Sequence, residues 1–267
     1  MNPEEYAIMY HVEDHHWWYR GMAQITRAVL DRWYRPGASL RILDAGCGTG
    51  GAMTSYLRDY GQVTGFDFAG EALHFCKTRG AKRLTRASVG EIPFPAESFD
   101  LVVSFDVLCE RAIRDDLAAL RELYRVLVPG GRVLLRLPAY NWLRGRHDVA
   151  VHIRHRYTRG EIGQRLCEAG FQVEHLSYAN AFLFPAALIK RMTERLMARQ
   201  EGLSDLTVSA GPLNGLLRAV LSAEAPLVAR QSLPFGLTVV AAGFKPTTHP
   251  TSIPASPSTT LPTTQQG

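Results

Sequence analysis

Cysteine is scarce in this sequence, and no two cysteines are spaced to hold a metal ion together. The four cysteines are Cys47, Cys76, Cys109 and Cys167, and no C-x-x-C pair occurs. Such spacing is typical of reduced, mostly buried thiols rather than of a disulfide framework or a zinc site. We therefore expect no metal site.

A long hydrophobic run is also missing. The longest apolar stretch, ANAFLFPAALI at residues 179–189, is too short to span a bilayer and contains a proline. The first twenty residues hold acids and histidines where a signal peptide needs a basic start and an apolar centre. We therefore expect a soluble, cytoplasmic protein.

Lysine is rare as well. Only 4 of the 30 basic residues are lysine, which leaves 26 arginines. The formal net charge is +5, but no dense run of basic residues occurs and acidic residues lie between them. This distribution argues against a nucleic-acid partner.

The length of 267 residues fits one large domain with a tail. Residues 246–267 are rich in proline, threonine and serine and offer almost nothing apolar to bury. A segment of that composition is expected to be disordered. We therefore predict one domain over residues 1–245, followed by a disordered tail.

One segment carries an unusual density of glycine. The stretch LRILDAGCGTGG, residues 40–51, runs from an apolar strand through Asp44 into glycines at positions 46, 48, 50 and 51. Glycine allows a tight turn and lets the backbone approach a ligand closely. Three of the glycines satisfy G-x-G-x-x-G, and Asp67 follows about 20 residues later, as in dinucleotide-binding proteins. Asp44 is not part of that pattern, so an NAD-dependent oxidoreductase is one of two open interpretations.

Apolar periodicity predicts strands that alternate with helices. Expected strands lie at residues 40–43, 62–68, 82–89, 100–108, 128–138, 172–180 and 237–245. Expected helices lie at residues 14–34, 69–79, 117–127, 158–171, 184–200 and 212–229. This alternation indicates an α/β fold with a mostly parallel sheet, whose ligands bind at the carboxyl ends of the strands.

Three segments together resemble the class I S-adenosylmethionine-dependent methyltransferases, and most closely the type 11-like group that methylates small molecules. They are DAGCGTG at residues 44–50, ASVGEIPFPAESFDLVVSFDVL at 87–108 and LRELYRVLVPGGRVLL at 120–135. The resemblance implies a Rossmann-like, doubly wound, seven-stranded sheet with an antiparallel last strand and a helical insertion at residues 184–229. It also implies S-adenosyl-L-methionine as the cofactor.

The resemblance gives roles to individual residues. Asp44 corresponds to the acid that helps to fix the cofactor's amino group, and the turn of Gly46, Gly48 and Gly50 passes its methionine half. Asp67 corresponds to the acid that accepts both ribose hydroxyls. It could instead serve only as the N-cap of the helix that follows.

Four further residues complete the expected cofactor pocket, and their roles again follow from the resemblance. Phe68 packs against the adenine, and Phe105 lines the methionine side or is simply a core aromatic residue. Ser88 replaces an acid that many relatives use for the adenine amino group, so the backbone of Val89 is expected to assist. The segment VLCER after the fourth strand also departs from the family, and no catalytic histidine is carried over there.

The helix expected at residues 14–34 is predicted to cap the cofactor. Trp18 belongs to its apolar stripe, whereas Arg20 lies off that stripe. An arginine there can pair with the cofactor's methionine carboxylate. The alternative is an arginine exposed to solvent.

The acceptor is expected to bind between residues 138–157 and the helices at 184–229. His152 and His155 are our candidates for a catalytic base, because a histidine can take a proton from a hydroxyl at neutral pH. The alternative is an ordinary polar loop, and the helices either pack on the core or form a lid. We predict O-methylation of a small-molecule, glycan or lipid-linked acceptor, with N- or C-methylation as open alternatives and with peripheral contact to a membrane. The alternative is a non-catalytic cofactor-binding scaffold or sensor.

Overall fold

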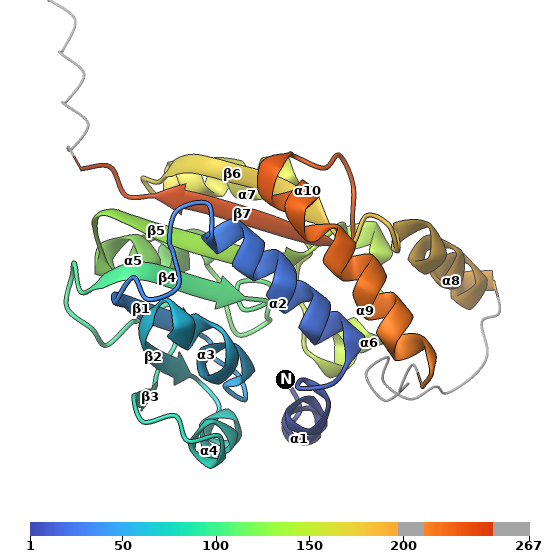
Figure 1. Ribbon diagram of the computed structural model, residues 1–267, viewed down its shortest axis with the longest axis horizontal. Coiled ribbons are helices and arrows are strands. Elements are labelled where there is room, and N and C mark those ends of the chain that lie inside the picture. The colour runs from blue at the N-terminus through green and yellow to red at the C-terminus, as the bar shows by residue number, and fades with distance from the viewer. Residues whose placement is uncertain (197–210, 248–267) are drawn as a thin grey trace, which may run out of the picture.

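The computed structural model describes residues 1–196 and 211–247 and is built around one seven-stranded sheet (Figure 1). The predicted tail beyond residue 247 lies outside the described residues. The strands are β1 Leu40–Ala45, β2 Gly61–Asp67, β3 Leu84–Arg86, β4 Phe99–Phe105, β5 Leu127–Pro138, β6 Gln172–Ala179 and β7 Thr238–Phe244. Their order in the sheet is β3-β2-β1-β4-β5-β7-β6.

The sheet confirms the predicted fold class and the antiparallel last strand. The pairs from β3 to β5 are all parallel, whereas β7 lies antiparallel between β5 and β6. Because β1, β2 and β4 are parallel neighbours, their carboxyl ends meet at one edge. Asp44, Asp67 and Phe105 therefore come together there, as the sequence predicted.

Helices cover both faces of the sheet (Figure 1). They are α1 Pro3–Val12, α2 Trp17–Leu30, α3 Gly51–Ser55, α4 Gly70–Thr78, α5 Asp116–Val126, α6 Arg146–Ala150, α7 Arg159–Glu168, α8 Phe184–Leu196, α9 Leu213–Ala223 and α10 Ala225–Arg230, with short 3-10 turns η1 Leu57–Asp59 and η2 Asn141–Leu143. Helices α5 and α7 pack on one face through a core that includes Leu123 and Leu166. Helices α2, α9 and α10 pack on the other through Ile25, Leu221 and Val228.

The N-terminal region differs from the sequence prediction. The helix expected from residue 14 begins at Trp17, where the His16 side chain accepts a hydrogen bond from the Trp18 backbone N–H. A separate helix, α1, precedes it and was missed. The apolar residues of α1 form no stripe along one face, so periodicity gives no signal for it.

The C-terminal helical region also differs. Residues 212–229 form two helices, α9 and α10, which are divided at Glu224. The Glu224 carboxylate is buried and accepts hydrogen bonds from the backbone N–H groups of Ala181 and Phe182, 3.1 and 2.6 Å away. This contact joins the end of β6 to the α9–α10 corner. Thr158 and Glu161 form a capping box at the start of α7, which begins within the helix predicted over residues 158–171.

In the part of the chain that the structure describes, no helix combines the length and the apolar character needed to cross a bilayer.

Candidate functional site

A cavity of about 880 Å³ opens at the carboxyl ends of β1, β2 and β4. Its size falls within the range of small-molecule and cofactor sites. Residues from α1, α2, α8 and segment 138–156 complete the lining. All but two of the predicted site residues line this cavity; the exceptions are Gly50 and His155.

The glycine turn forms the floor of the cavity because its backbone adopts conformations that side chains disfavour. Gly46, Gly48 and Gly50 have φ values of +83°, +54° and +82°. A Cβ at Gly46 would also collide with the Val107 side chain. The turn therefore requires glycine at these positions and leaves backbone exposed to a ligand. Gly50 is the N-cap of α3 and lies behind the cavity lining.

Asp44 is the most unusual group in the cavity. Its side chain is only 2% exposed, and among the described residues its Oδ2 atom has no hydrogen-bond partner. Burial, followed by the nearby charge of Asp67, raises the pKa of this carboxyl group to about 7. A buried carboxylate without a partner is costly, so Asp44 is suited to receive a cationic or hydrogen-bond-donating ligand group.

Asp67 is held by the backbone on both of its oxygens. Its Oδ2 accepts from the Gly48 N–H and its Oδ1 from the Ala69 N–H, each at 2.9 Å. Burial raises the pKa of Asp67, while these two hydrogen bonds lower it. The N-cap of α4 is Ala69 rather than Asp67. Each carboxylate oxygen keeps a second lone pair for a ligand hydroxyl.

The expected adenine end of the cavity is partly open. The Phe68 ring is 65% exposed and has the Arg86 guanidinium 5.7 Å from its centroid. Ser88 Oγ accepts a hydrogen bond of 3.2 Å from the Gly90 N–H, and Val89 is buried behind it. An exposed ring beside a hydrogen-bonding turn can stack against a flat heterocycle.

The opposite end contains an arginine that the sequence analysis missed. The Arg136 guanidinium lies 4.5 Å from the centroid of Phe105 and 5.2 Å from that of Trp18, and its Nε donates to Asp106 at 3.2 Å. Phe105 and Arg136 are paired across β4 and β5. The sequence signal that could have identified Arg136 is a charged residue near the carboxyl end of an otherwise apolar strand.

Helix α1 brings a second missed residue to the cavity. Glu13 accepts from the Thr49 hydroxyl of the glycine turn and pairs with Arg79 at 2.9 Å. Burial raises the pKa of Glu13. Tyr10 of α1 stacks on Phe75 of α4 with 4.7 Å between ring centroids, which holds α1 beside the cavity.

The predicted bases occupy different environments. His152 lines the cavity, and burial, the N-terminal amino group and Arg111 lower its pKa. His155 lies outside the lining, with Nδ1 3.1 Å from the Asn141 amide and Nε2 2.6 Å from Glu161. Its ring is therefore occupied by structural contacts.

The VLCER segment supplies a residue that the sequence analysis passed over. Glu110 lines the cavity, and a β-bridge to Ile153 places it next to the His152 segment. Burial raises the pKa of Glu110 to about 7, against the opposing effect of the N-terminal amino group. A carboxyl group that titrates near neutrality can exchange a proton with an acceptor.

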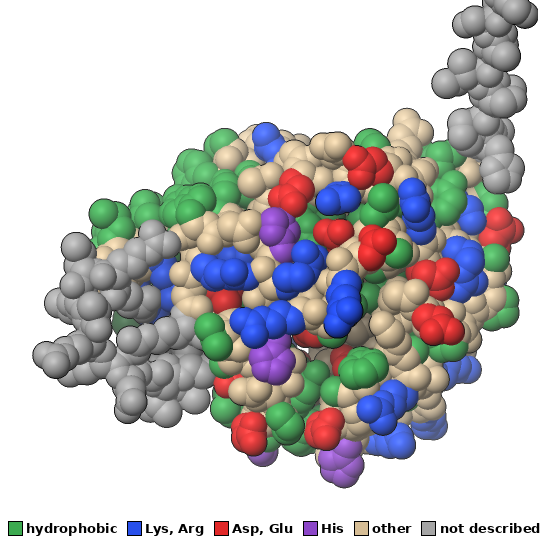
Figure 2. Space-filling model, turned by 180° about the vertical axis from the view of Figure 1, so that it is seen from behind, with side chains coloured by type: hydrophobic (Ala, Val, Ile, Leu, Met, Phe, Trp, Pro, Cys, Tyr) green, Lys and Arg blue, Asp and Glu red, His purple; other side chains and the backbone are tan. Residues whose placement is uncertain are grey.

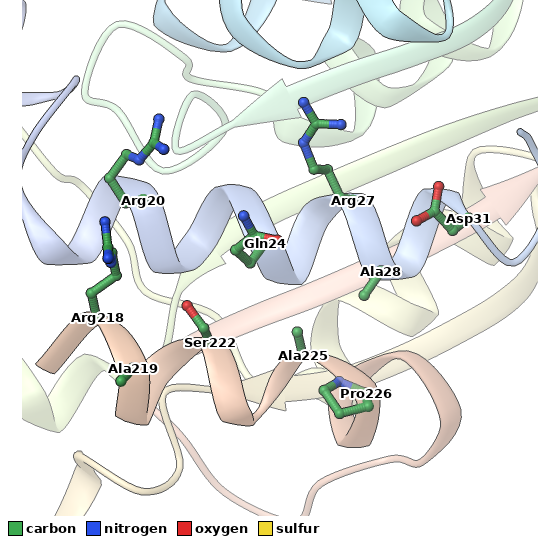
Figure 3. A pocket seen from close by; sticks show the side chains of 10 residues that line it. All are labelled: Arg20, Gln24, Arg27, Ala28, Asp31, Arg218, Ala219, Ser222, Ala225 and Pro226. Atoms are coloured by element: carbon green, nitrogen blue, oxygen red, sulfur yellow. The ribbon is translucent and has the colours of Figure 1, made fainter. Parts of the chain in front are cut away.

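Arg20 lies at the margin of the cavity. It is exposed on α2 and lines both this cavity and a separate groove between α2 and α9, where Figure 3 shows its side chain. Within residues 1–196 and 211–247, its guanidinium has no hydrogen-bond or ion-pair partner. It can thus reach a ligand in either place.

Known proteins match both the sequence and the fold. Residues 43–135 match the family model of a methyltransferase domain. A demethylmenaquinone methyltransferase of Staphylococcus aureus is 36% identical over 116 residues, which are 40% of this chain and 46% of that enzyme. The chain therefore spans less than half the length of that relative.

Solved structures of low sequence identity share the fold. A methyltransferase of Haloferax volcanii, solved with the Trm112 methyltransferase activator, is 19% identical with a TM-score of 0.58, over 93% of this chain and 96% of that one. An S-adenosylmethionine-dependent methyltransferase of Thermotoga maritima is 15% identical with a TM-score of 0.56, over 91% and 95% of the two chains. Residues 43–135 thus match a methyltransferase domain, and the described chain has the fold and strand order of class I S-adenosylmethionine-dependent methyltransferases.

Proposed function

We propose that this protein transfers a methyl group from S-adenosylmethionine to a hydroxyl oxygen of a small-molecule acceptor. The observation that carries the proposal is the buried, unpartnered Asp44 carboxylate beside Asp67 at the glycine turn. Six acidic side chains line the cavity, namely Glu13, Asp14, Asp44, Asp67, Asp106 and Glu110. An acidic cavity suits a cofactor that carries an ammonium and a sulfonium charge.

The residues present fit this cofactor. Asp44 would receive the ammonium group, and the free lone pairs of Asp67 would accept the ribose hydroxyls. Phe68, Ser88 and Val89 would hold the adenine. Arg20 and Arg136 are two candidates for the carboxylate, and Arg136 has the more buried position, with 12% of its side chain exposed.

The cofactor supplies a methyl group that its sulfonium already activates. The protein then has to align the acceptor, exclude water and remove the hydroxyl proton. Glu110 and His152 both line the cavity, on segments joined by the Glu110–Ile153 β-bridge, and are our two proposed bases. The raised pKa of Glu110 and the lowered pKa of His152 leave both able to accept a proton near neutral pH.

The acceptor side supports a small or lipid-linked molecule. Leu143, Val151 and Ile153 line the cavity together with Ala187 of α8. Of the predicted lid over residues 184–229, α8 lines the cavity and remains the proposed lid, whereas α9 and α10 pack on the core and residues 197–210 lie outside the described part of the chain. The methyl acceptor that the staphylococcal relative's name gives, demethylmenaquinone, is a small molecule.

A peripheral membrane contact is part of the proposal. Large apolar side chains are exposed on α8 and α9, with Ile189 at 64%, Met192 at 55% and Leu216 at 60%. Figure 2 shows hydrophobic side chains gathered at the end of the molecule where α8 lies. Exposed apolar residues beside basic ones, such as Lys190 and Arg191, favour binding at a lipid interface.

Replacing Asp67 tests the cofactor. We expect calorimetry to detect binding of S-adenosylmethionine and S-adenosylhomocysteine but not of NAD. Asp67→Ala removes a charged acceptor for two hydroxyls and should weaken S-adenosylmethionine binding by about 1.5–3 kcal/mol per strong bond lost. Binding of NAD in place of S-adenosylmethionine would return the oxidoreductase interpretation.

Replacing Asp44 tests, through the stability of the protein, whether its buried carboxylate has no partner. Because folding raises its pKa from about 3.9 to about 7, the unliganded protein loses stability as pH rises through this window. Asp44→Asn cannot ionise and should be more stable than the wild type at pH 8, by about 1–4 kcal/mol in urea unfolding, with a smaller difference at pH 5. Saturating S-adenosylmethionine should favour the wild type instead.

A matched control is Asp148→Asn. Asp148 is equally buried, at 1% exposure, but its carboxylate pairs with Arg156 at 2.8 and 3.0 Å. Loss of a paired buried charge should lower stability at both pH values. If Asp44→Asn behaves like Asp148→Asn, the Asp44 carboxylate has a partner and the proposal loses its basis.

The base is tested by methyl transfer to sugars, quinols, phenols and lipid-linked glycans. On the best acceptor, Glu110→Gln or His152→Asn should slow transfer by roughly 100-fold or more. The wild-type rate should rise with pH through about 7 as Glu110 loses its proton. His155→Ala serves as the comparison, because that ring lies outside the cavity. Full rates in both cavity variants would exclude them as bases, and binding without any transfer would favour the scaffold alternative.

A further inference from the structure

A second hollow lies between α2 and the α9–α10 corner, on the outer side of the helical layer. It is a groove of about 680 Å³ (Figure 3). Its lining residues are Arg20, Gln24, Arg27, Ala28, Asp31, Arg218, Ala219, Ser222, Ala225 and Pro226. Among the described lining residues, Arg20 alone is shared with the cofactor cavity, so the methyl-transfer proposal does not account for the groove.

The walls of the groove are held at a fixed separation. Gly21 of α2 lacks a side chain where the fully buried Leu221 of α9 packs, and a Cβ there would lie 2.6 Å from Leu221 carbons. Asn214 of α9 accepts from the Trp17 N–H at 2.8 Å and donates to the His15 carbonyl at 2.9 Å. The two helices are therefore locked together at the end that carries Arg20 and Arg218.

Some of the charged side chains in the groove have hydrogen-bond or ion-pair partners, and others have none among the described residues. Arg27 pairs with Asp59 at 2.6 Å, and Asp31 accepts from the Tyr60 hydroxyl at 2.6 Å. In the described parts of the chain, Arg20 and Arg218 have neither an ion pair nor a hydrogen bond from their guanidinium groups. Figure 3 shows the two at the same end of the groove. Two like charges there repel each other unless an anion lies between them.

We propose that this groove binds a phosphate group between Arg20 and Arg218. Guanidinium groups recognise phosphate oxygens through paired N–H donors, and two of them on fixed helices can hold one group. Gln24 and Ser222 add neutral donors, while the small side chains of Ala28 and Ala219 leave room above the helix contact. The proposal assigns Arg20 to the groove, which leaves Arg136 as the partner of the cofactor carboxylate, and Arg218 does not line the cofactor cavity.

The test uses inorganic pyrophosphate titrated by calorimetry into the full chain saturated with S-adenosylhomocysteine. We expect binding that weakens with added salt and that Arg218→Ala weakens at least tenfold. The matched control is Arg230→Ala, an exposed arginine in the last turn of α10 outside the groove lining, which should change the affinity less than twofold. Absence of pyrophosphate binding, or equal losses in both variants, would overturn the proposal.

Two further measurements distinguish misfolding from loss of the phosphate site, and a lipid phosphate from a soluble phosphate ester. Arg218→Ala should bind S-adenosylhomocysteine with the wild-type affinity. A weaker affinity would show that this variant misfolds, and the pyrophosphate titration is then made with Arg218→Lys. The phosphate belongs to a lipid if the protein sediments with phosphatidic acid vesicles but not phosphatidylcholine vesicles, and if Leu213→Ser, on exposed α9, reduces this binding. It belongs to a soluble phosphate ester if pyrophosphate binds and neither vesicle does.

Discussion

The rest of the site depends on one electrostatic constraint, the burial of Asp44 next to Asp67 at the carboxyl edge of the sheet. Parallel pairing of β1 with β2 brings the two carboxyl groups to the same edge. The backbone N–H groups of Gly48 and Ala69 stabilise Asp67, but Asp44 keeps an oxygen without a partner in the described protein. A folded protein retains such a group at a cost in stability, which is typical of a functional site.

The glycine turn and the N-terminal helices follow from that constraint. Positive φ values at Gly46 and Gly48 allow the backbone to pass beneath the carboxylates. Glu13, at the end of α1, contacts Thr49 of the turn and Arg79 at the end of α4. These contacts hold α1 beside the part of the cavity that contains the glycine turn. Arg136 lies between Phe105 and Trp18 and pairs with Asp106. Its charge also lowers the pKa of Asp44, so it balances part of the negative charge.

Much of the fold could be predicted from the sequence, because strand–helix alternation and the three family-like segments are local patterns. Asp44 and Asp67 were found because they end strands. Helix α1 and Glu13 were missed because α1 has no apolar stripe, and Arg136 because its contacts depend on the pairing of β4 with β5. His152 and His155 look alike in sequence. Only the tertiary contacts with Asn141 and Glu161 separate them.

The acidic side chains of the cavity are suited to a cationic methyl donor. The most direct measurement compares calorimetric affinities of S-adenosylmethionine and S-adenosylhomocysteine at pH 5.5 and pH 8. Because Asp44 and Glu110 have pKa values of about 7, S-adenosylmethionine should bind at least roughly fivefold more tightly at pH 8, with a smaller gain for the uncharged thioether. Equal affinities at both pH values, or no binding of either compound, would contradict the account.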